Sequence, residues 1–146
     1  MAVDPYFITA DFPQESQIIG KAREINNYKA FWCAEKIKNT IQAFELKHSR
    51  VPVIALMGLA FKPNIDDLRE SPAIYIAQKV LQGAHDETYL LVEPNVENHA
   101  YYKITALEEA LEKADVIAFL VAHNQFKQLT VRDDQVILDF CGVTKQ

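Results

Sequence analysis

The sequence Val51-Pro-Val-Ile-Ala-Leu-Met-Gly-Leu-Ala-Phe-Lys-Pro-Asn-Ile-Asp-Asp-Leu-Arg-Glu-Ser-Pro72 decides the fold of this chain. It opens with an apolar, β-branched run that ends at Gly58 and predicts a buried strand. A polar loop follows, and Ser71-Pro72 predicts a helix start, with serine as the N-cap and proline in the first turn. In α/β folds, ligands bind at the carboxyl ends of the strands. We therefore expect the ligand site in this loop, where free backbone N–H groups and the helix dipole favour a phosphate.

Strands and helices alternate from this stretch to the end of the chain. The apolar run at 116–121 is nearly continuous, which is typical of a strand covered on both faces. Alternation of this kind predicts right-handed crossovers and a parallel sheet. Residues 51–146 are thus predicted to form a Rossmann-like α/β domain, with helices on both faces of the sheet. The predicted strands are 53–57, 88–92, 116–121 and 136–140, and the predicted helices are 72–81 (ended by Gly83), 106–113 (capped by Thr105) and 125–129.

Residues 1–50 are predicted to be largely helical. Residues 1–10 are expected to be extended or turned, because Pro5 restricts the residue before it. A helix is expected to start with Asp11 as its cap and Pro13 in its first turn, and to be interrupted at Asn26-Asn27. A second apolar stripe follows helical spacing and packs either on its own domain or, with the added surface of Phe31 and Trp32, on another domain or subunit. The stripe consists of Ala30, Ala34, Ile37, Ile41 and Phe44.

Composition excludes several classes of protein. The net charge is −5, from 20 acidic and 15 basic residues, which does not favour a nucleic-acid surface. Two cysteines form neither a disulfide framework nor a zinc set, so we expect a reducing cytoplasm and no metal. No apolar run approaches the roughly 20 residues of a membrane span, and the segment MAVDPYFITADF lacks the basic and apolar regions of a signal peptide.

The loop from Phe61 to Arg69 is the main candidate for chemistry. Lys62 and Arg69 flank the acidic pair Asp66-Asp67. Either these four charges are solvated and partly satisfy one another, or the two cations meet the anionic oxygens of a nucleotide. The chain has no GxGxxG sequence and no Walker lysine. A nucleotide site here therefore depends on side chains and on the position at the end of the strand.

Four further residues come into consideration. Asp4 is either a general base or a turn former. Cys33 lies in the helical stripe and is expected in the core. Cys141 follows the last predicted strand, where it is either a packed residue or a reactive thiol. His123 is the only one of four histidines at the expected binding edge, and we expect a surface position for it, since the histidines lack metal-ligand spacing.

Residues 58–72 also resemble the signature of the UDP-sugar 6-dehydrogenases of the UDP-glucose/GDP-mannose dehydrogenase family. The form Pro-Asn-Ile-Asp-Asp-Leu resembles the UDP-N-acetyl-D-mannosamine branch, and the stretches 2–7, 22–26 and 114–127 agree in order and spacing. The resemblance implies a two-step, NAD-dependent oxidation of the C6 alcohol of a UDP-sugar to a carboxylate, through a cysteine thiohemiacetal and thioester. It also implies an N-terminal NAD-binding domain, a helical middle that forms a homodimer, and a C-terminal UDP-binding α/β domain. Such an enzyme supplies the uronic acid for a surface polysaccharide.

On this resemblance, residues 1–50 are the end of the helical middle and residues 51–146 the UDP-binding domain. Asp4 matches the aspartate that helps to activate the hydrolytic water. Phe61 and Lys62 match the pair that contacts the UDP-sugar, and Arg69 matches an arginine that reaches NAD.

The family's nucleophilic cysteine lies four residues before the aspartate that Asp4 matches, so we expect it upstream of Met1, together with the glycine fingerprint, and the chain alone to be inactive. Cys141 stands where the family usually has a basic residue. The alternatives are a UDP-glucose 6-dehydrogenase or another branch, or a nucleotide-binding module without catalysis.

Overall fold

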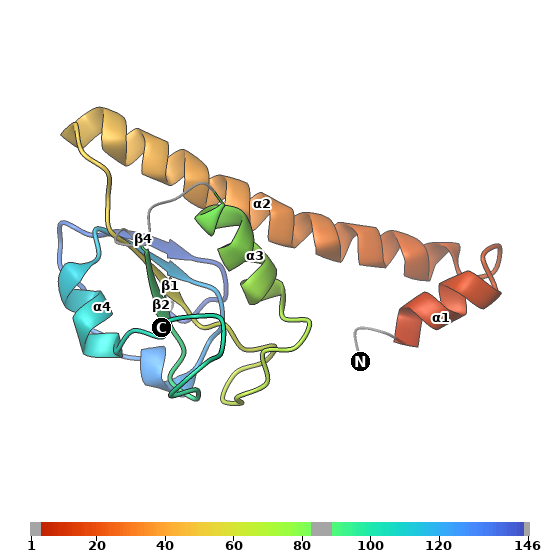
Figure 1. Ribbon diagram of the computed structural model, residues 1–146. Helices are drawn as coiled ribbons and strands as arrows, with labels where there is room; N and C mark the ends of the chain where they lie inside the picture. The colour runs from red at the N-terminus through yellow and green to blue at the C-terminus, as the bar shows by residue number, and fades with distance from the viewer. Residues whose placement is uncertain (1–3, 83–88, 145–146) are drawn as a thin grey trace.

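The computed structural model describes residues 4–82 and 89–144, with the backbone alone at Asp4 and Pro5. Its four strands form one parallel sheet in the order β2-β1-β3-β4, and helices cover both faces (Figure 1). The predicted α/β fold with a preceding helical segment is therefore confirmed. The elements are α1 (Asp4–Asp11), α2 (Gln17–His48), β1 (Ile54–Met57), α3 (Pro72–Leu81), β2 (Tyr89–Val92), α4 (Leu107–Lys113), β3 (Val116–Phe119), the 3-10 helix η2 (Asn124–Phe126) and β4 (Val136–Asp139).

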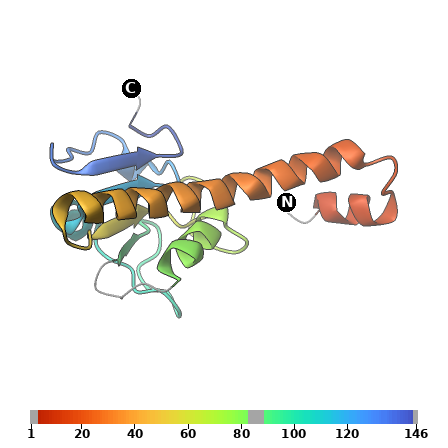
Figure 2. The ribbon, with the colours of Figure 1, turned by 90° about the horizontal axis from the view of Figure 1, so that it is seen from above.

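The core has two layers, one on each face of the sheet. Successive residues of a strand point to opposite faces, so Ile54 and Leu56 of β1 pack towards α2 and α3. Ala55 and Met57 pack towards α4 and η2. Figure 2 shows α2 lying across its face of the sheet. The predicted stripe of α2 is buried against the sheet and α3 together with Cys33, and consists of Ala30, Ala34, Ile37, Ile41 and Phe44.

The N-terminal part differs from the sequence prediction in three ways. Residues 4–11 form α1 rather than an extended segment, because Pro5 stands in the first turn, where its missing N–H costs nothing. The next helix begins after Ser16 and not after Asp11. It runs without a break through Asn26-Asn27, since two exposed asparagines cost a helix only a fraction of a kcal/mol each.

The predicted element bounds in the α/β part hold to within two or three residues, with some differences of detail. The N-cap of α4 is Ala106, without a side-chain hydrogen bond, so the predicted capping by Thr105 is wrong. Ile104 forms an isolated parallel bridge with Leu91, and the helix expected at 125–129 is the shorter η2. The expected helix end at Gly83 lies outside the described residues. No helix among the described residues is long and apolar enough to cross a membrane.

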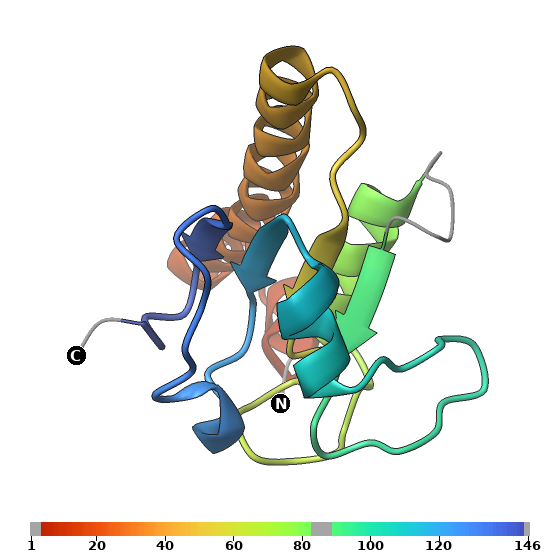
Figure 3. The same cartoon turned by 90° about the vertical axis from the view of Figure 1, so that its left-hand side faces the viewer.

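An ion pair between Arg50 and Asp115 anchors the segment after α2 at the amino ends of the strands. The fork of Arg50 donates to both carboxylate oxygens of Asp115, at 2.7 and 2.6 Å. Asp115 also accepts the N–H of Val53 at 2.9 Å. The loops that follow β1, β2 and β3 lie at the carboxyl ends of the strands, and Figure 3 shows them gathered at one end of the domain.

Candidate functional site

A pocket of about 900 Å³ lies between α2, α3 and the carboxyl ends of the strands. This volume is within the range of small-molecule sites in proteins. Phe61 after β1, Leu120 after β3 and Phe140 after β4 line it at the end of the sheet. α3 contributes its N-terminal residues, among them Pro72. α2 contributes four polar residues to the wall, namely the cations Arg23 and Lys29 and the amides Asn26 and Asn27.

The turn at Gly58 brings the loop into this position. Gly58 has a φ of 89°, and a Cβ atom there would lie 2.7 Å from Cβ of Val121. Only glycine fits both the backbone conformation and the space. At the other end of the loop, the Ser71 hydroxyl accepts the N–H of Ala73 at 3.1 Å and donates to the carbonyl of Ala60 at 3.1 Å. The predicted N-cap is confirmed, and it also ties the loop to α3.

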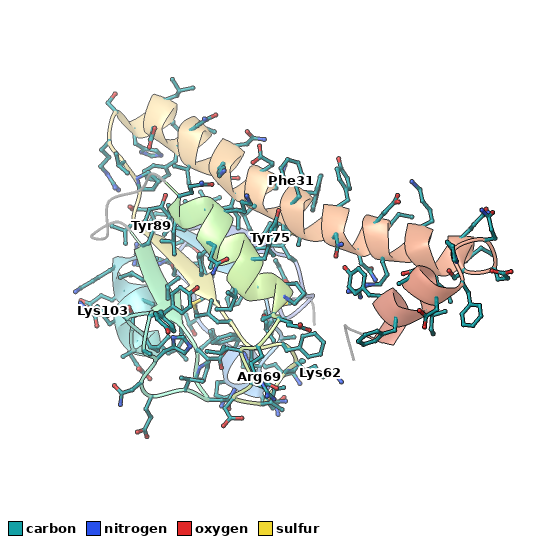
Figure 4. All side chains as sticks on the ribbon, turned by 45° about the vertical axis from the view of Figure 1, so that its right-hand side comes forward. Phe31, Lys62, Arg69, Tyr75, Tyr89 and Lys103 are labelled. Carbon is teal, nitrogen blue, oxygen red and sulfur yellow. The ribbon has the colours of Figure 1, made fainter. Side chains whose placement is uncertain are left out.

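Two of the predicted loop residues, Phe61 and Arg69, line two different hollows, and Lys62 lines neither of them. Phe61 is half-buried in the wall of the pocket, and the exposed Lys62 has its Nζ 5.7 Å from the Phe61 ring centroid. Arg69 lines a second, shallower hollow of about 530 Å³. Figure 4 shows Lys62 and Arg69 at the same end of the domain, beyond the start of α3.

The charges of the loop partly satisfy one another. Arg69 donates through Nε and Nη2 to the two oxygens of Asp67, at 2.9 and 2.8 Å. These bonds, together with the Arg69 backbone N–H, lower the pKa of Asp67 to about 2. Arg69 nevertheless has an 88 % exposed side chain. Since a guanidinium has five N–H donors, it retains free donors for a ligand.

Sequence reasoning missed the buried pair Glu93 and His123. Their side chains are 2 % and 0 % exposed, and Oε2 of Glu93 lies 3.1 Å from Nε2 of His123. The expected surface position of His123 is therefore wrong, because the chain after β3 turns inward before η2. Glu93 directly follows β2, and His123 lies a few residues after the end of β3; both strands flank β1. Their common position at the carboxyl ends of neighbouring strands was the available signal.

The pair also corrects the expected phosphate site. The N–H groups of Leu59 and Ala60 donate to Oε2 of Glu93, at 2.7 and 2.9 Å. Phe61 N–H donates to the carbonyl of Asp67 and Asn64 N–H donates to His123. These backbone donors are thus used within the protein. An anionic ligand therefore cannot use these four donors, and the exposed side chains of Lys62 and Arg69 remain available to it.

Arg23 is a cation that the sequence prediction did not include. It lines the pocket from α2, and its guanidinium lies over the Tyr6 ring, 5.0 Å from the centroid. Its Nε atom is buried without a hydrogen-bond partner among the described residues. Such an unpaired buried donor favours an acceptor from a ligand.

The remaining candidates have structural surroundings. Cys33 is 3 % exposed in the core. Burial and the charge of Asp139 raise the pKa of Cys141 to about 11, which favours a packed thiol over a reactive one. The backbone of Asp4 begins α1, while its side chain lies outside the described part, so its role stays a prediction. Within the described ranges, no group of three His, Cys, Asp or Glu residues is arranged to hold a metal.

Comparison with known proteins places these features in one family. Residues 55–146 match the model of the UDP-glucose/GDP-mannose dehydrogenase family, UDP binding domain. The chain is 43% identical over 160 residues to a UDP-N-acetyl-D-mannosamine dehydrogenase of Escherichia coli K12, which covers 98% of the chain. It is 39% identical over 149 residues to an NDP-N-acetyl-D-galactosaminuronic acid dehydrogenase of Ralstonia nicotianae, again over 98% of the chain.

A solved structure agrees with the sequence comparisons. A UDP-N-acetyl-mannosamine dehydrogenase from S. aureus superimposes with a TM-score of 0.77 at 30% identity and covers 100% of the chain. The chain spans about a third of these relatives, namely 36% of the E. coli protein, 34% of the Ralstonia protein and 34% of the S. aureus protein.

Proposed function

This chain belongs to the UDP-glucose/GDP-mannose dehydrogenase family, and on that premise we propose that it is the UDP-sugar-binding part of a UDP-N-acetyl-D-mannosamine 6-dehydrogenase. In this proposal residues 51–146 are the UDP-sugar-binding domain and residues 1–50 are the end of the central helical domain. The observation that carries it is the pocket at the carboxyl ends of the strands, with Phe61 of the family sequence in its wall. The E. coli relative of that name matches along the whole chain and not only along the UDP-binding domain.

The pocket offers separate features to the parts of a UDP-sugar. Apolar groups at the sheet end, including Phe61 and Phe140, suit the flat face of a base or sugar ring. The exposed Lys62, next to Phe61 in the chain, provides a point charge for the diphosphate. Arg23 and Lys29 add positive charge from α2. Two negative phosphates would thus meet cations from the loop after β1 and from α2.

The whole reaction would need groups outside this chain. Family resemblance implies oxidation of the C6 alcohol to a carboxylate in two steps, through a cysteine thioester, to give UDP-N-acetylmannosaminuronate. Neither Cys33 nor Cys141 suits the nucleophile, because one is in the core and the other has a raised pKa. We therefore place the nucleophile elsewhere in the protein, and expect Asp4 to act beside it on the hydrolytic water.

NAD would accept the hydride in this reaction. The chain contains no glycine fingerprint, so most of the cofactor site would also lie outside it. Arg69 fits a peripheral contact, since it is exposed, stands at a hollow of its own and keeps free N–H donors beside Asp67. This chain alone is expected to produce no NADH.

A homodimer would cover an apolar surface around the N-terminal half of α2. Large apolar residues are exposed on both α1 and α2, far beyond the scattered ones that monomers carry. Figure 1 shows that these segments extend away from the sheet. The exposed residues there include Phe7, Phe12, Ile18, Ile25, Tyr28, Phe31 and Trp32.

Calorimetric titration with UDP tests the proposed site. Lys62→Ala should raise the dissociation constant roughly tenfold to a hundredfold, as expected for the loss of a charged hydrogen bond. Lys36→Ala is the matched control, because it removes the same charge from an exposed position on α2, outside the loop that follows β1. If the two variants bind UDP equally well, the assignment of Lys62 fails.

A related sugar is the second candidate substrate. The Ralstonia relative at 39% identity is named for N-acetyl-D-galactosaminuronic acid. N-acetylmannosamine and N-acetylgalactosamine differ in the stereochemistry of the sugar ring. Turnover of UDP-N-acetylmannosamine, UDP-N-acetylgalactosamine and UDP-glucose by the full-length protein would separate the candidates. Preference for either of the other two sugars would overturn the mannosamine assignment and leave the nucleotide site intact.

A further inference from the structure

A buried polar cluster lies directly beneath the loop that carries Phe61 and Lys62. It joins residues from the ends of three segments: Glu93 after β2, His123 after β3, and Asn64 in the loop after β1. We infer that Glu93 and His123 are positioning residues, which hold residues 59–64 in the conformation that presents Phe61 and Lys62 to a nucleotide. The ligand half of this inference rests on the proposed function, whereas the loop half can be tested without any ligand.

The carboxylate of Glu93 occupies the position inside the loop where a bound anion would accept the backbone N–H groups. Its Oε2 accepts the N–H groups of Leu59 and Ala60, at 2.7 and 2.9 Å. Its Oε1 accepts the backbone and side-chain N–H groups of Asn95, both at 3.2 Å. Every neighbour that meets the carboxylate is a donor, so it is ionised. Burial acts to raise its pKa, but the hydrogen bonds from His123, Leu59 and Asn95 outweigh burial and lower it.

His123 connects this carboxylate to the far end of the loop. Its Nδ1 lies 2.9 Å from the backbone nitrogen of Asn64, and a backbone N–H can only donate. Nδ1 therefore carries no proton, and the single ring proton sits on Nε2, where it is donated to Glu93 across 3.1 Å. This tautomer is fixed by the contacts on both sides of the ring.

The loop conformation depends on this connection at Asn64. Asn64 has a φ of 62°, in the left-handed region, and its side-chain Oδ1 accepts the N–H of Asn124 at 2.8 Å. Two hydrogen bonds thus tie Asn64 to the segment around His123. Lys62 lies between this anchor and the one at Leu59 and Ala60. The Phe61 N–H, which donates to the carbonyl of Asp67, is a further contact within the loop.

Neither residue of the pair reaches a ligand itself. Their side chains are 2 % and 0 % exposed, so they act on binding only through the loop. A cluster of this kind is worth most when every member is satisfied, and removal of one member leaves the others unpaired in a low dielectric. Small changes in the pair should therefore appear as changes in the loop.

Two substitutions of His123 separate its contacts at Nδ1, with Asn64 and the Asn95 amide, from its contact at Nε2 with Glu93. In His123→Asn, the amide oxygen stands close to the place of Nδ1 and can accept the N–H of Asn64, while the bond to Glu93 is lost. In His123→Gln, the amide nitrogen can reach Glu93, while the acceptor for Asn64 is lost. Glu93→Gln replaces one acceptor oxygen by a donor group. His48→Asn is the control, since His48 stacks on Phe44 at the other end of the molecule.

Amide hydrogen exchange of the unliganded chain is the first measurement. Glu93→Gln should accelerate exchange at Leu59 and Ala60 at least tenfold. His123→Gln should do so at Asn64, and His123→Asn should not. Nitrogen-15 spectra of the wild type should show a neutral His123 with the proton on Nε2. Unchanged exchange in all three variants, or a proton on Nδ1, would overturn the inference.

Titration with UDP is the second measurement. Glu93→Gln and His123→Gln should raise the dissociation constant at least fivefold, and His48→Asn should leave it unchanged. If the loop amides respond but UDP binding does not, the pair is structural only and the positioning role is refuted. If the wild type binds no UDP, the proposed function fails for this chain, and the exchange data alone decide whether the pair holds the loop.

Discussion

Replacement of Gly58 by alanine is a direct test of the turn that aims the loop. The new Cβ atom would lie 2.7 Å from Cβ of Val121 and 3.0 Å from its carbonyl oxygen. A positive φ costs an ordinary L residue about 1–2 kcal/mol, and overpacking of a filled site costs about 1–3 kcal/mol. We therefore expect Gly58→Ala to lose about 2–5 kcal/mol, a large part of the 5–15 kcal/mol that stabilises a typical domain.

Gly142 provides a matched control for this substitution. It also has a positive φ, of 77°, but among the described residues no atom beyond its chain neighbours lies within 4 Å of the position that a Cβ would take. Gly142→Ala should therefore pay the conformational cost without the steric one. The difference between the two variants isolates the contact with Val121, at about 1–3 kcal/mol.

Urea denaturation followed by circular dichroism measures both variants. With a slope of about 1–3 kcal/mol per molar urea, the midpoint of Gly58→Ala should lie roughly 0.5–2 M below that of Gly142→Ala. Gly58→Ala should also weaken UDP binding, because the backbone that carries Phe61 and Lys62 is displaced. Equal midpoints for the two variants would refute the reasoning, since the close approach at Val121 would then have no cost.

Two further predictions concern titratable groups at the end of β4 and just after it. Burial acts to raise the pKa of Asp139, but the Thr144 hydroxyl and the N–H groups of Thr144, Cys141 and Gly142 outweigh it and hold the pKa well below its usual range. Because the pKa of Asp139 is lower in the folded state, this stabilisation is complete above the unfolded pKa of about 4 and is lost as pH falls below it. The difference in urea midpoint between wild type and Asp139→Asn should be constant from about pH 5 to 8 and should shrink below about pH 4. A difference that does not depend on pH would contradict this. The raised pKa of Cys141, about 11, predicts slow alkylation by iodoacetamide at pH 7.5 and a steep rise towards pH 10; rapid labelling at pH 7.5 that disappears in Cys141→Ser would revive the reactive thiol.

Several features of the fold could be predicted from local sequence patterns. The apolar runs at 53–57 and 116–121 predicted buried strands, because a strand covered on both faces needs apolar residues at nearly every position. Ser71-Pro72 predicted the start of α3 to the residue, since an N-cap depends only on its immediate neighbours. The helical stripe in α2 was predicted for the same reason, from a period of a few residues.

The N-terminal region was predicted less well, because its local signals are weak. Pro5 and Asn26-Asn27 were taken as interruptions, yet a proline is compatible with a first turn and an asparagine costs a helix little. Packing of α1 on α2, and of α2 on α3, also favours these helices. Tertiary contacts decided the length of both helices.

The sequence by itself determined that residues 51–72 form a strand, a loop and a capped helix, and that the loop lies at the carboxyl end of a parallel sheet. Only the tertiary structure decided what lies inside that loop. Glu93 and His123 are 30 residues apart along the chain, and their contact depends on the strand order β2-β1-β3, which no local period specifies. Because the buried carboxylate of Glu93 accepts the N–H groups of Leu59 and Ala60, the tertiary structure removes these two donors from the set that a phosphate could use.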